Sequence, residues 1–281
     1  MATHAVHRAG VTLAVQDTGE QPGNGIPILL LHGLTATHRY VVMGSTRLER
    51  AGHRVISFDA RGHGVSSPAP DPAAYGYGEL ALDAVAVLDA LAVPRAVLAG
   101  ASMGAHTLLR VALEQPDRAG GVVVITPAYE PGDTENELRL ARWDQLADGL
   151  RSGGVEGFLA AYGEPRVPAA WRDTVLAVIS QRLSLHRYPD AVADALSAVP
   201  RSSPFATIAE LQRISVPAAI VASADEADPE HPQAVGEAYA NAIPGARLIT
   251  DEPGRSPVAW QGSQLSAVIA EVAADAGGNE R

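Results

Sequence analysis

The sequence lacks cysteine and lysine, and aromatic residues make up only 5% of it. Without cysteine, disulfides, thiolate nucleophiles and cysteine-ligated metals are excluded. Without lysine, all 21 basic residues are arginine, so neither a Schiff base nor a lysine general base is possible. Proton transfer near neutral pH must therefore use one of the nine histidines, a carboxylate with a shifted pKa or a tyrosine.

The chain is also poor in positive charge. Its formal net charge is −11, and it contains no run of basic residues, which argues against nucleic acid or an anionic membrane surface as a partner. It has no apolar stretch long enough to span a bilayer and no signal-peptide core near residue 1. We therefore expect a cytoplasmic protein that acts on a small molecule and uses no metal or other cofactor.

A serine flanked by glycines stands out in the middle of the chain. Gly100-Ala-Ser-Met-Gly104 has the pattern G-x-S-x-G, and it lies between a short apolar run and a segment with helical spacing. In that context the pattern predicts a nucleophile elbow, with Ser102 on a sharp strand-to-helix turn. The helix N-terminus beside it would favour a developing negative charge. Taken alone, the pattern also fits an ordinary turn built from small residues.

Apolar runs of strand length alternate with helical patterns along most of the chain, which predicts an α/β fold with a mostly parallel, doubly wound sheet. An edge hairpin is expected over residues 6–17 and a helix over 39–51. The predicted strands cover residues 26–31, 54–58, 97–99, 121–126, 218–222 and 247–250, and the first of them reads as buried on both faces.

The alternation stops between residues 130 and 213. That stretch contains several helical segments, some separated by prolines, and no obvious strand. It predicts a helical cap inserted over one end of the sheet. The domain organisation expected is therefore an α/β core of residues 1–129 and 214–281, with a cap of residues 130–213.

Three motifs follow one another along the chain: Leu29-Leu-Leu-His-Gly33, Asp59-x-Arg-Gly-His-Gly-x-Ser66 and Gly100-x-Ser-x-Gly104. Together they resemble the α/β-hydrolase family over nearly the whole chain, with the cap as the variable part. The resemblance implies that Ser102 is the nucleophile and that the main-chain N–H groups of Met103 and Leu34 form the oxyanion hole. Such a donor contributes about 3 kcal/mol to transition-state stabilisation.

The resemblance also implies an acid in the loop after residues 218–222. An aspartate four residues before a proline selects Asp228, which precedes Pro232, and Asp225 is the alternative. The residues of the second motif usually brace loops beside the site. Those expected to do so here are Asp59, Arg61 and His63.

The resemblance fails at the general base. The family places a histidine in a Gly-His-Ser-Pro-like turn after the last strand, whereas this chain has Arg255 there. A guanidinium stays protonated and has no lone pair with which to accept the proton of Ser102. We interpret Arg255, together with His32, as substrate-binding. If Asp228 is correctly placed, the substitution Arg255→His is expected to raise ester hydrolysis.

A relocated histidine would restore a base. By position the candidates are His32, His38, His186 and His231. His231 is favoured because it lies in the same loop as Asp228, although an exposed loop histidine without a catalytic role is the alternative. His106, inside the helix after the elbow, is expected to be packed.

We therefore predict serine-dependent hydrolysis, or acyl transfer, of a small apolar carbonyl substrate by a non-standard triad. Lyase, isomerase or cyclase chemistry in the same pocket is one alternative, and a ligand-binding protein without turnover is another. Cap aromatic residues would line the cavity or simply pack in the cap core. They are Trp143, Phe158, Tyr162 and Trp171.

Overall fold

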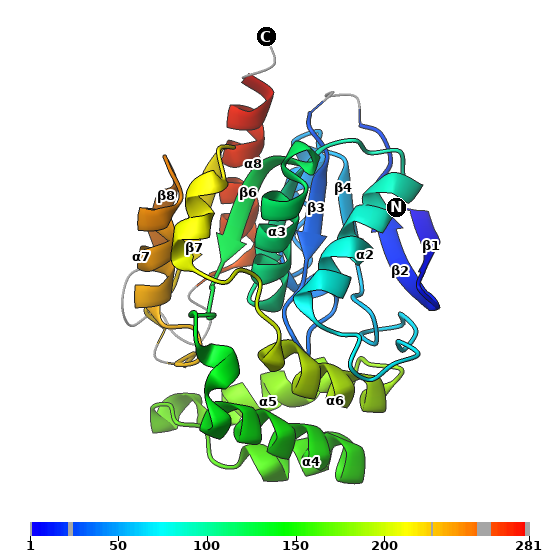
Figure 1. Ribbon diagram of the computed structural model, residues 1–281, viewed down its shortest axis with the longest axis vertical. Coiled ribbons are helices and arrows are strands. Elements are labelled where there is room, and N and C mark those ends of the chain that lie inside the picture. Colours follow the sequence, from blue (N-terminus) through cyan, green and yellow to red (C-terminus); the bar gives the residue numbers. More distant parts are fainter. Residues whose placement is uncertain (1, 22–24, 226, 252–259, 279–281) are drawn as a thin grey trace.

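One eight-stranded sheet forms the centre of the chain in the computed structural model, which describes residues 2–21, 25–225, 227–251 and 260–278 (Figure 1). The strand order is β1-β2-β4-β3-β5-β6-β7-β8. β1 pairs with β2 and β2 with β4 in antiparallel fashion, and the other pairs are parallel. The strands are β1 (Ala2–Arg8), β2 (Val11–Asp17), β3 (Ile28–Leu31), β4 (Val55–Phe58), β5 (Ala96–Ala101), β6 (Ala119–Ile125), β7 (Ala218–Ala222) and β8 (Arg247–Thr250).

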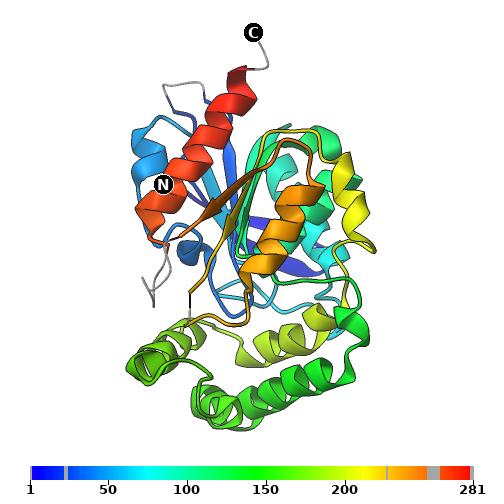
Figure 2. The ribbon, with the colours of Figure 1, turned by 90° about the vertical axis from the view of Figure 1, so that its left-hand side faces the viewer.

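Helices cover both faces of the sheet, as Figure 2 shows from the side. Alternate residues of a strand point to opposite faces, so Leu29 and Leu31 pack with α2 (Tyr77–Ala90), α3 (Met103–Glu114) and α7 (Gln233–Ala242). Ile28 and Leu30 pack with α1 (Arg47–Arg50) and α8 (Gly262–Gly278). Burial on two faces explains the unbroken apolar runs of β3, β5, β6 and β7, whereas the edge strand β8 is mostly exposed. The predicted α/β fold is confirmed.

The helix predicted over residues 39–51 is wrong. The structure has a 3₁₀ turn at His38–Tyr40 and a short α1 at Arg47–Arg50. Between them Met43 and Gly44 have φ values of 48° and 74°. Left-handed backbone cannot continue a right-handed helix, so the chain must turn there.

Helices of residues 130–213 lie across the end of the sheet to which the arrowheads of β3 and β6 point (Figure 1). We call these residues the helical cap. It contains α4 (Glu137–Tyr162), α5 (Arg172–Leu183) and α6 (Pro189–Ala198). α4 changes direction at Gly154, whose φ of 60° is not helical. In the described part of the chain, no helix is both long and apolar enough to cross a membrane.

Candidate active site

The turn between β5 and α3 is strained and tightly packed. Ser102 occupies it with φ 50° and ψ −113°, a conformation that a non-glycine residue adopts only where the surroundings enforce it. A side chain at Gly104 would collide with the main chain of Leu31, and one at Gly100 would collide with the carbonyl of Gly104. Glycine is therefore required on both sides of the serine, because β3 and α3 pass within contact of this turn.

The Ser102 hydroxyl contacts a histidine that is 129 residues away in the chain. His231 Nε2 lies 2.9 Å from Ser102 Oγ. The other ring nitrogen, Nδ1, lies 2.8 Å and 2.9 Å from the two carboxylate oxygens of Asp228. With the Nδ1 proton donated to the carboxylate, Nε2 is left as the acceptor for the serine hydroxyl. Serine, histidine and carboxylate thus form one continuous line of hydrogen bonds.

The loop after β7 brings acid and base together by folding into two turns. Asp228 N–H donates to Asp225 O over 3.0 Å, and His231 N–H donates to Asp228 O over 3.3 Å. Residues three apart in such a turn project to the same side. The side chain of Asp225 accepts from Ala227 N–H at 2.8 Å, so it braces the loop from within. No described hydrogen bond joins Asp225 to His231, whose Nδ1 contacts Asp228.

Asp228 is held in its charged form. Desolvation raises the pKa of this carboxyl, but the charge and hydrogen bond of His231, together with the charge of Arg182, outweigh it and lower the pKa. The Asp228 side chain is 42% exposed and that of His231 is 21% exposed. A charged acceptor in contact with Nδ1 fixes the orientation of the ring and favours the imidazolium that forms when Nε2 takes a proton.

Two main-chain N–H groups flank the serine. Met103 begins α3, where the first N–H groups have no partner within the helix. The loop after β3 approaches from the other side, since a Cβ built on Gly33 would lie 3.5 Å from Ser102 Cβ. Leu34 follows in that loop, and Thr35 has a φ of 65°. Within the described residues neither the Leu34 nor the Met103 N–H donates to a protein acceptor.

The site opens into a cavity of about 1860 Å³ between the sheet and the helical cap. Ser102, Asp228 and His231 all line it, so the serine hydroxyl is not sealed beneath packed side chains. The cap contributes Trp143, Phe158 and Tyr162 to the wall.

His32 does not lie in this cavity, contrary to its interpretation as a substrate-binding residue. It is 2% exposed. Its Nδ1 lies 2.8 Å from Gly33 O, and its Nε2 accepts from Ala60 N–H at 2.9 Å. Burial lowers its pKa to about 4, so the ring is neutral. With both nitrogens engaged inside the protein, His32 supports the loop after β3 and has no ring atom left for a ligand.

The other histidines considered as bases are also engaged elsewhere. His38 Nδ1 lies 2.8 Å from the carboxylate of Asp59. His186 accepts from Gly64 N–H at 2.8 Å and donates to Thr35 O at 2.9 Å, which ties the cap to the loops of the core. His106 bonds to Tyr77 Oη at 3.0 Å and is buried. Among the described histidines, His231 is the only one whose ring lies within hydrogen-bond distance of the Ser102 hydroxyl.

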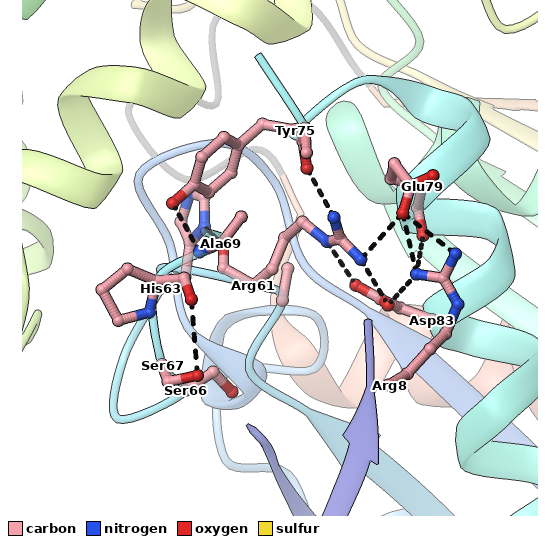
Figure 3. Close-up of polar contacts among 12 residues, drawn as sticks. Arg8, Arg61, His63, Ser66, Ser67, Ala69, Tyr75, Glu79 and Asp83 are labelled. Carbon is pink, nitrogen blue, oxygen red and sulfur yellow. Dashed lines mark hydrogen bonds and ion pairs between the residues drawn. The ribbon is translucent and has the colours of Figure 1, made fainter. Parts of the chain in front are cut away.

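Arg61 is part of a buried ionic network rather than the cavity. Its guanidinium donates to both carboxylate oxygens of Asp83 at 2.7 Å and 2.8 Å (Figure 3). Arg8 reaches the same carboxylate at 2.8 Å and Glu79 at 2.9 Å. Figure 3 shows this cluster joining β1, α2 and the loop of the second motif. The geometry is that of a brace between elements.

Two further points concern the binding role of Arg255 and the possibility of a metal site. Arg255 lies outside the described residues, so its assignment to substrate binding stays a prediction. In the part of the chain that is described, no group of three or more histidines and carboxylates is placed to hold a metal ion.

Comparisons with known proteins place this fold and site in context. A family model for the alpha/beta hydrolase fold matches residues 26–256. The "putative carbamate hydrolase RutD" of Variovorax paradoxus is 33% identical over 150 residues, covering 53% of this chain and 54% of that protein. The 3-oxoadipate enol-lactonase 2 of Acinetobacter baylyi is 30% identical over 175 residues, 61% of each protein. The chain thus matches about half the length of the first curated relatives.

A solved structure extends the similarity over most of the chain. Est816, described as an N-acyl homoserine lactone degrading enzyme, is 29% identical with a TM-score of 0.67, and the match covers 88% of this chain and 91% of that one. The three relatives named here carry the names of hydrolytic enzymes, and the family model spans most of the sequence. The chain therefore belongs to the α/β-hydrolase fold family.

Proposed function

We propose that the protein is a serine hydrolase that cleaves small carboxylic esters or lactones with a triad of Ser102, His231 and Asp228. The observation that carries the proposal is the position of the His231 ring. One nitrogen lies 2.9 Å from Ser102 Oγ and the other lies 2.8 Å from Asp228. The histidine that the family places after the last strand is thereby replaced by one three residues beyond the acid.

In the proposed mechanism Ser102 Oγ attacks the substrate carbonyl carbon while His231 Nε2 takes the hydroxyl proton. The carbonyl oxygen becomes an oxyanion that accepts from the N–H groups of Met103 and Leu34. When the intermediate collapses, the bond to the leaving oxygen breaks and His231 returns the proton to that oxygen. Water then attacks the acyl-serine with His231 again as base, which releases the acid and restores Ser102.

Two features support hydrolysis over the non-hydrolytic and binding-only alternatives. A base in contact with the serine hydroxyl is what nucleophilic catalysis requires, and a protein that only binds a ligand has no use for the strained backbone of Ser102. Lactone-cleaving enzymes also occur among the relatives. We therefore extend ester or lactone hydrolysis to this chain as the proposal.

The test combines turnover with labelling. We expect the protein to hydrolyse 4-nitrophenyl acetate and to react with a fluorophosphonate at Ser102, which peptide mass spectrometry would locate. Ser102→Ala should abolish both signals. A folded protein that neither turns over the ester nor takes up the label at any pH would contradict the proposal, as would an unchanged rate in Ser102→Ala.

A further inference from the structure

The wall of the cavity is richer in positive charge than the chain as a whole. The chain carries 32 acidic and 21 basic residues, yet the described cavity lining has five arginines and only four carboxylates. One of those carboxylates, Asp228, is bonded to His231, and another, Glu164, is paired with Arg172. The arginines are Arg39, Arg139, Arg142, Arg166 and Arg182.

Most of these arginines are exposed or have protein partners. Arg142 donates to the carbonyls of Ala161 and Tyr162 at 2.7 Å and 2.6 Å, where it closes the end of α4. Arg139 lies 3.7 Å from the carboxylate of Asp133. Arg182 differs, because no carboxylate in the described residues lies within ion-pair distance of it, although its side chain is largely covered.

Arg182 is held rigidly beside the loop that follows β3. It projects from the last turn of α5, and its Nη2 donates to Thr35 Oγ1 at 3.0 Å and points at Leu34 O at 3.5 Å. Its Nε is buried without a partner, and Nη1 has no protein acceptor in the described part of the chain. The guanidinium is thus fixed at one corner while its other donors remain unused.

An unpaired guanidinium in a cavity wall is expensive to keep. Burial lowers the pKa of Arg182, with the nearby charge of Asp228 acting in the opposite sense. The group nevertheless stays charged near neutral pH, and a desolvated charge without a partner is unfavourable. A carboxylate of a ligand can accept a charge-assisted hydrogen bond from the unused Nη1 group of such a guanidinium. A fixed guanidinium also loses little entropy on binding.

We propose that Arg182 binds a carboxylate carried by the substrate, so that the cavity takes half-esters or lactone acids whose reacting carbonyl lies at Ser102 and whose anionic end lies under the cap. This inference rests on the proposed hydrolase function, and it adds an anionic end to the small apolar carbonyl substrate expected from the sequence. The aromatic side chains of the cap then contact the carbon chain between the two ends.

The test compares one acyl chain with and without its charge. 4-Nitrophenyl hydrogen glutarate and its methyl ester present the same reacting carbonyl, and the succinate and adipate pairs vary the reach. We expect kcat/KM to be at least about tenfold higher for the charged member of the best pair. In Arg182→Met this ratio should fall by about 10- to 100-fold, as expected for loss of a charge-assisted hydrogen bond.

The ratio separates binding from a merely structural role. If Arg182 only positions the loop at Leu34 and Thr35, its loss lowers turnover of both esters together and the ratio stays constant. Arg151→Met is the matched control: it removes an arginine that pairs with Asp194 on the cap and does not line the cavity. Its ratio should equal that of the parent. A parent ratio of one or below, or a ratio retained in Arg182→Met, would overturn the inference.

Binding to an inactive variant keeps this inference apart from the proposed function. In Ser102→Ala, calorimetric titration should show that monomethyl glutarate binds more tightly than dimethyl glutarate, and that adding Arg182→Met removes the difference. If Arg182→Met does not fold, Arg182→Lys replaces it, with a smaller loss because an ammonium is a single point charge. If the parent protein hydrolyses no ester but monomethyl glutarate still binds more tightly, only the hydrolase function is refuted. If the two compounds bind equally well, the carboxylate site is refuted.

Discussion

Two aspartate–histidine pairs lie at the carboxyl ends of parallel strands, and their surroundings differ. Asp59, after β4, is 2% exposed and accepts from His38 Nδ1 at 2.8 Å and from the N–H groups of His38 and Val65 at 2.9 Å and 3.1 Å. Asp228, after β7, is far more exposed, and the described hydrogen bonds to its side chain come from His231 alone.

The difference separates a brace from a candidate base. Burial raises the pKa of Asp59, but the hydrogen bond of His38 and the positive charge that His32 and His38 carry once protonated bring it down to about 2. That carboxylate is fully used in fixing loops. The Asp228 pair is equally short, but the second nitrogen of its histidine faces a hydroxyl and an open cavity. An aspartate–histidine contact therefore indicates catalysis only where the far ring nitrogen meets a reacting group.

The largest effect should come from removing the candidate base. In His231→Ala we expect kcat for ester hydrolysis to fall by about 10⁴- to 10⁶-fold, as in triads that lose histidine, with thermal unfolding little changed. Stopped-flow and long-time assays of 4-nitrophenyl acetate would measure it. His38→Ala, the matched change in the other pair, should keep most of the rate. Comparable losses in both variants would break the comparison.

A smaller loss is expected at the acid. Asp228→Asn keeps the shape of the side chain but removes its charge, so the histidine loses its orientation and the stabilisation of its protonated form. We expect kcat to fall by about 10²- to 10⁴-fold, the upper figure being that of a fully buried triad aspartate. Asp225→Asn provides the control. If it proved the more damaging of the two, the acid would have been assigned to the wrong residue.

The buried pair should respond in stability instead of rate. Asp59→Asn leaves donors at His38 and Val65 facing an amide, and loss of such a buried charged acceptor costs about 2–4 kcal/mol. Urea unfolding at pH 7 would measure the change in free energy. Asp228→Asn should lose less than half of that. An Asp59→Asn protein as stable as the parent would show that this carboxylate does not brace the fold.

Acid should destabilise the protein through its buried histidines. Burial lowers the pKa of His32 to about 4 and that of His106 to about 3. Above pH 6.5 neither state gains a proton, but as the pH falls towards 4 the unfolded chain takes up protons that the folded chain cannot. His32 alone then contributes a loss of about 3 kcal/mol, since one pKa unit is about 1.4 kcal/mol. Urea titrations at pH 7, 6 and 5 should show the free energy of unfolding falling at each step. A free energy that stays constant would contradict the conclusion that these histidines are buried in their neutral form.

The smallest effect concerns Arg255. With His231 already in contact with Ser102, the site has no vacant base position to fill, so Arg255→His should bring no gain in hydrolysis of 4-nitrophenyl acetate. This reverses the expectation drawn from the sequence, which assumed a missing base. A tenfold gain would mean that His231 serves the serine poorly and would favour the original expectation.

Much of the fold was predictable from the sequence. Continuous apolar runs predicted the parallel strands, because burial on both faces leaves no polar positions, and the glycines around Ser102 predicted the turn. The helix over residues 39–51 was predicted wrongly, because a composition suited to a helix does not reveal the left-handed backbone at Met43 and Gly44. Both residues face solvent at this turn, since Met43 is largely exposed and, chain neighbours aside, no atom lies within 4 Å of where a Gly44 side chain would begin.

By itself, the sequence determined the family of folds, the serine at the elbow and the loss of a histidine after the last strand. Only the tertiary structure decided which histidine meets that serine, why His32 cannot bind a ligand and where Arg182 points. These relations join residues far apart in the chain, such as 102 and 231. They depend on the order of the strands in the sheet and on the position of the cap over it. The periodicity of apolar residues and the residues of a turn report only on nearby chain, so neither predicts which distant side chains meet.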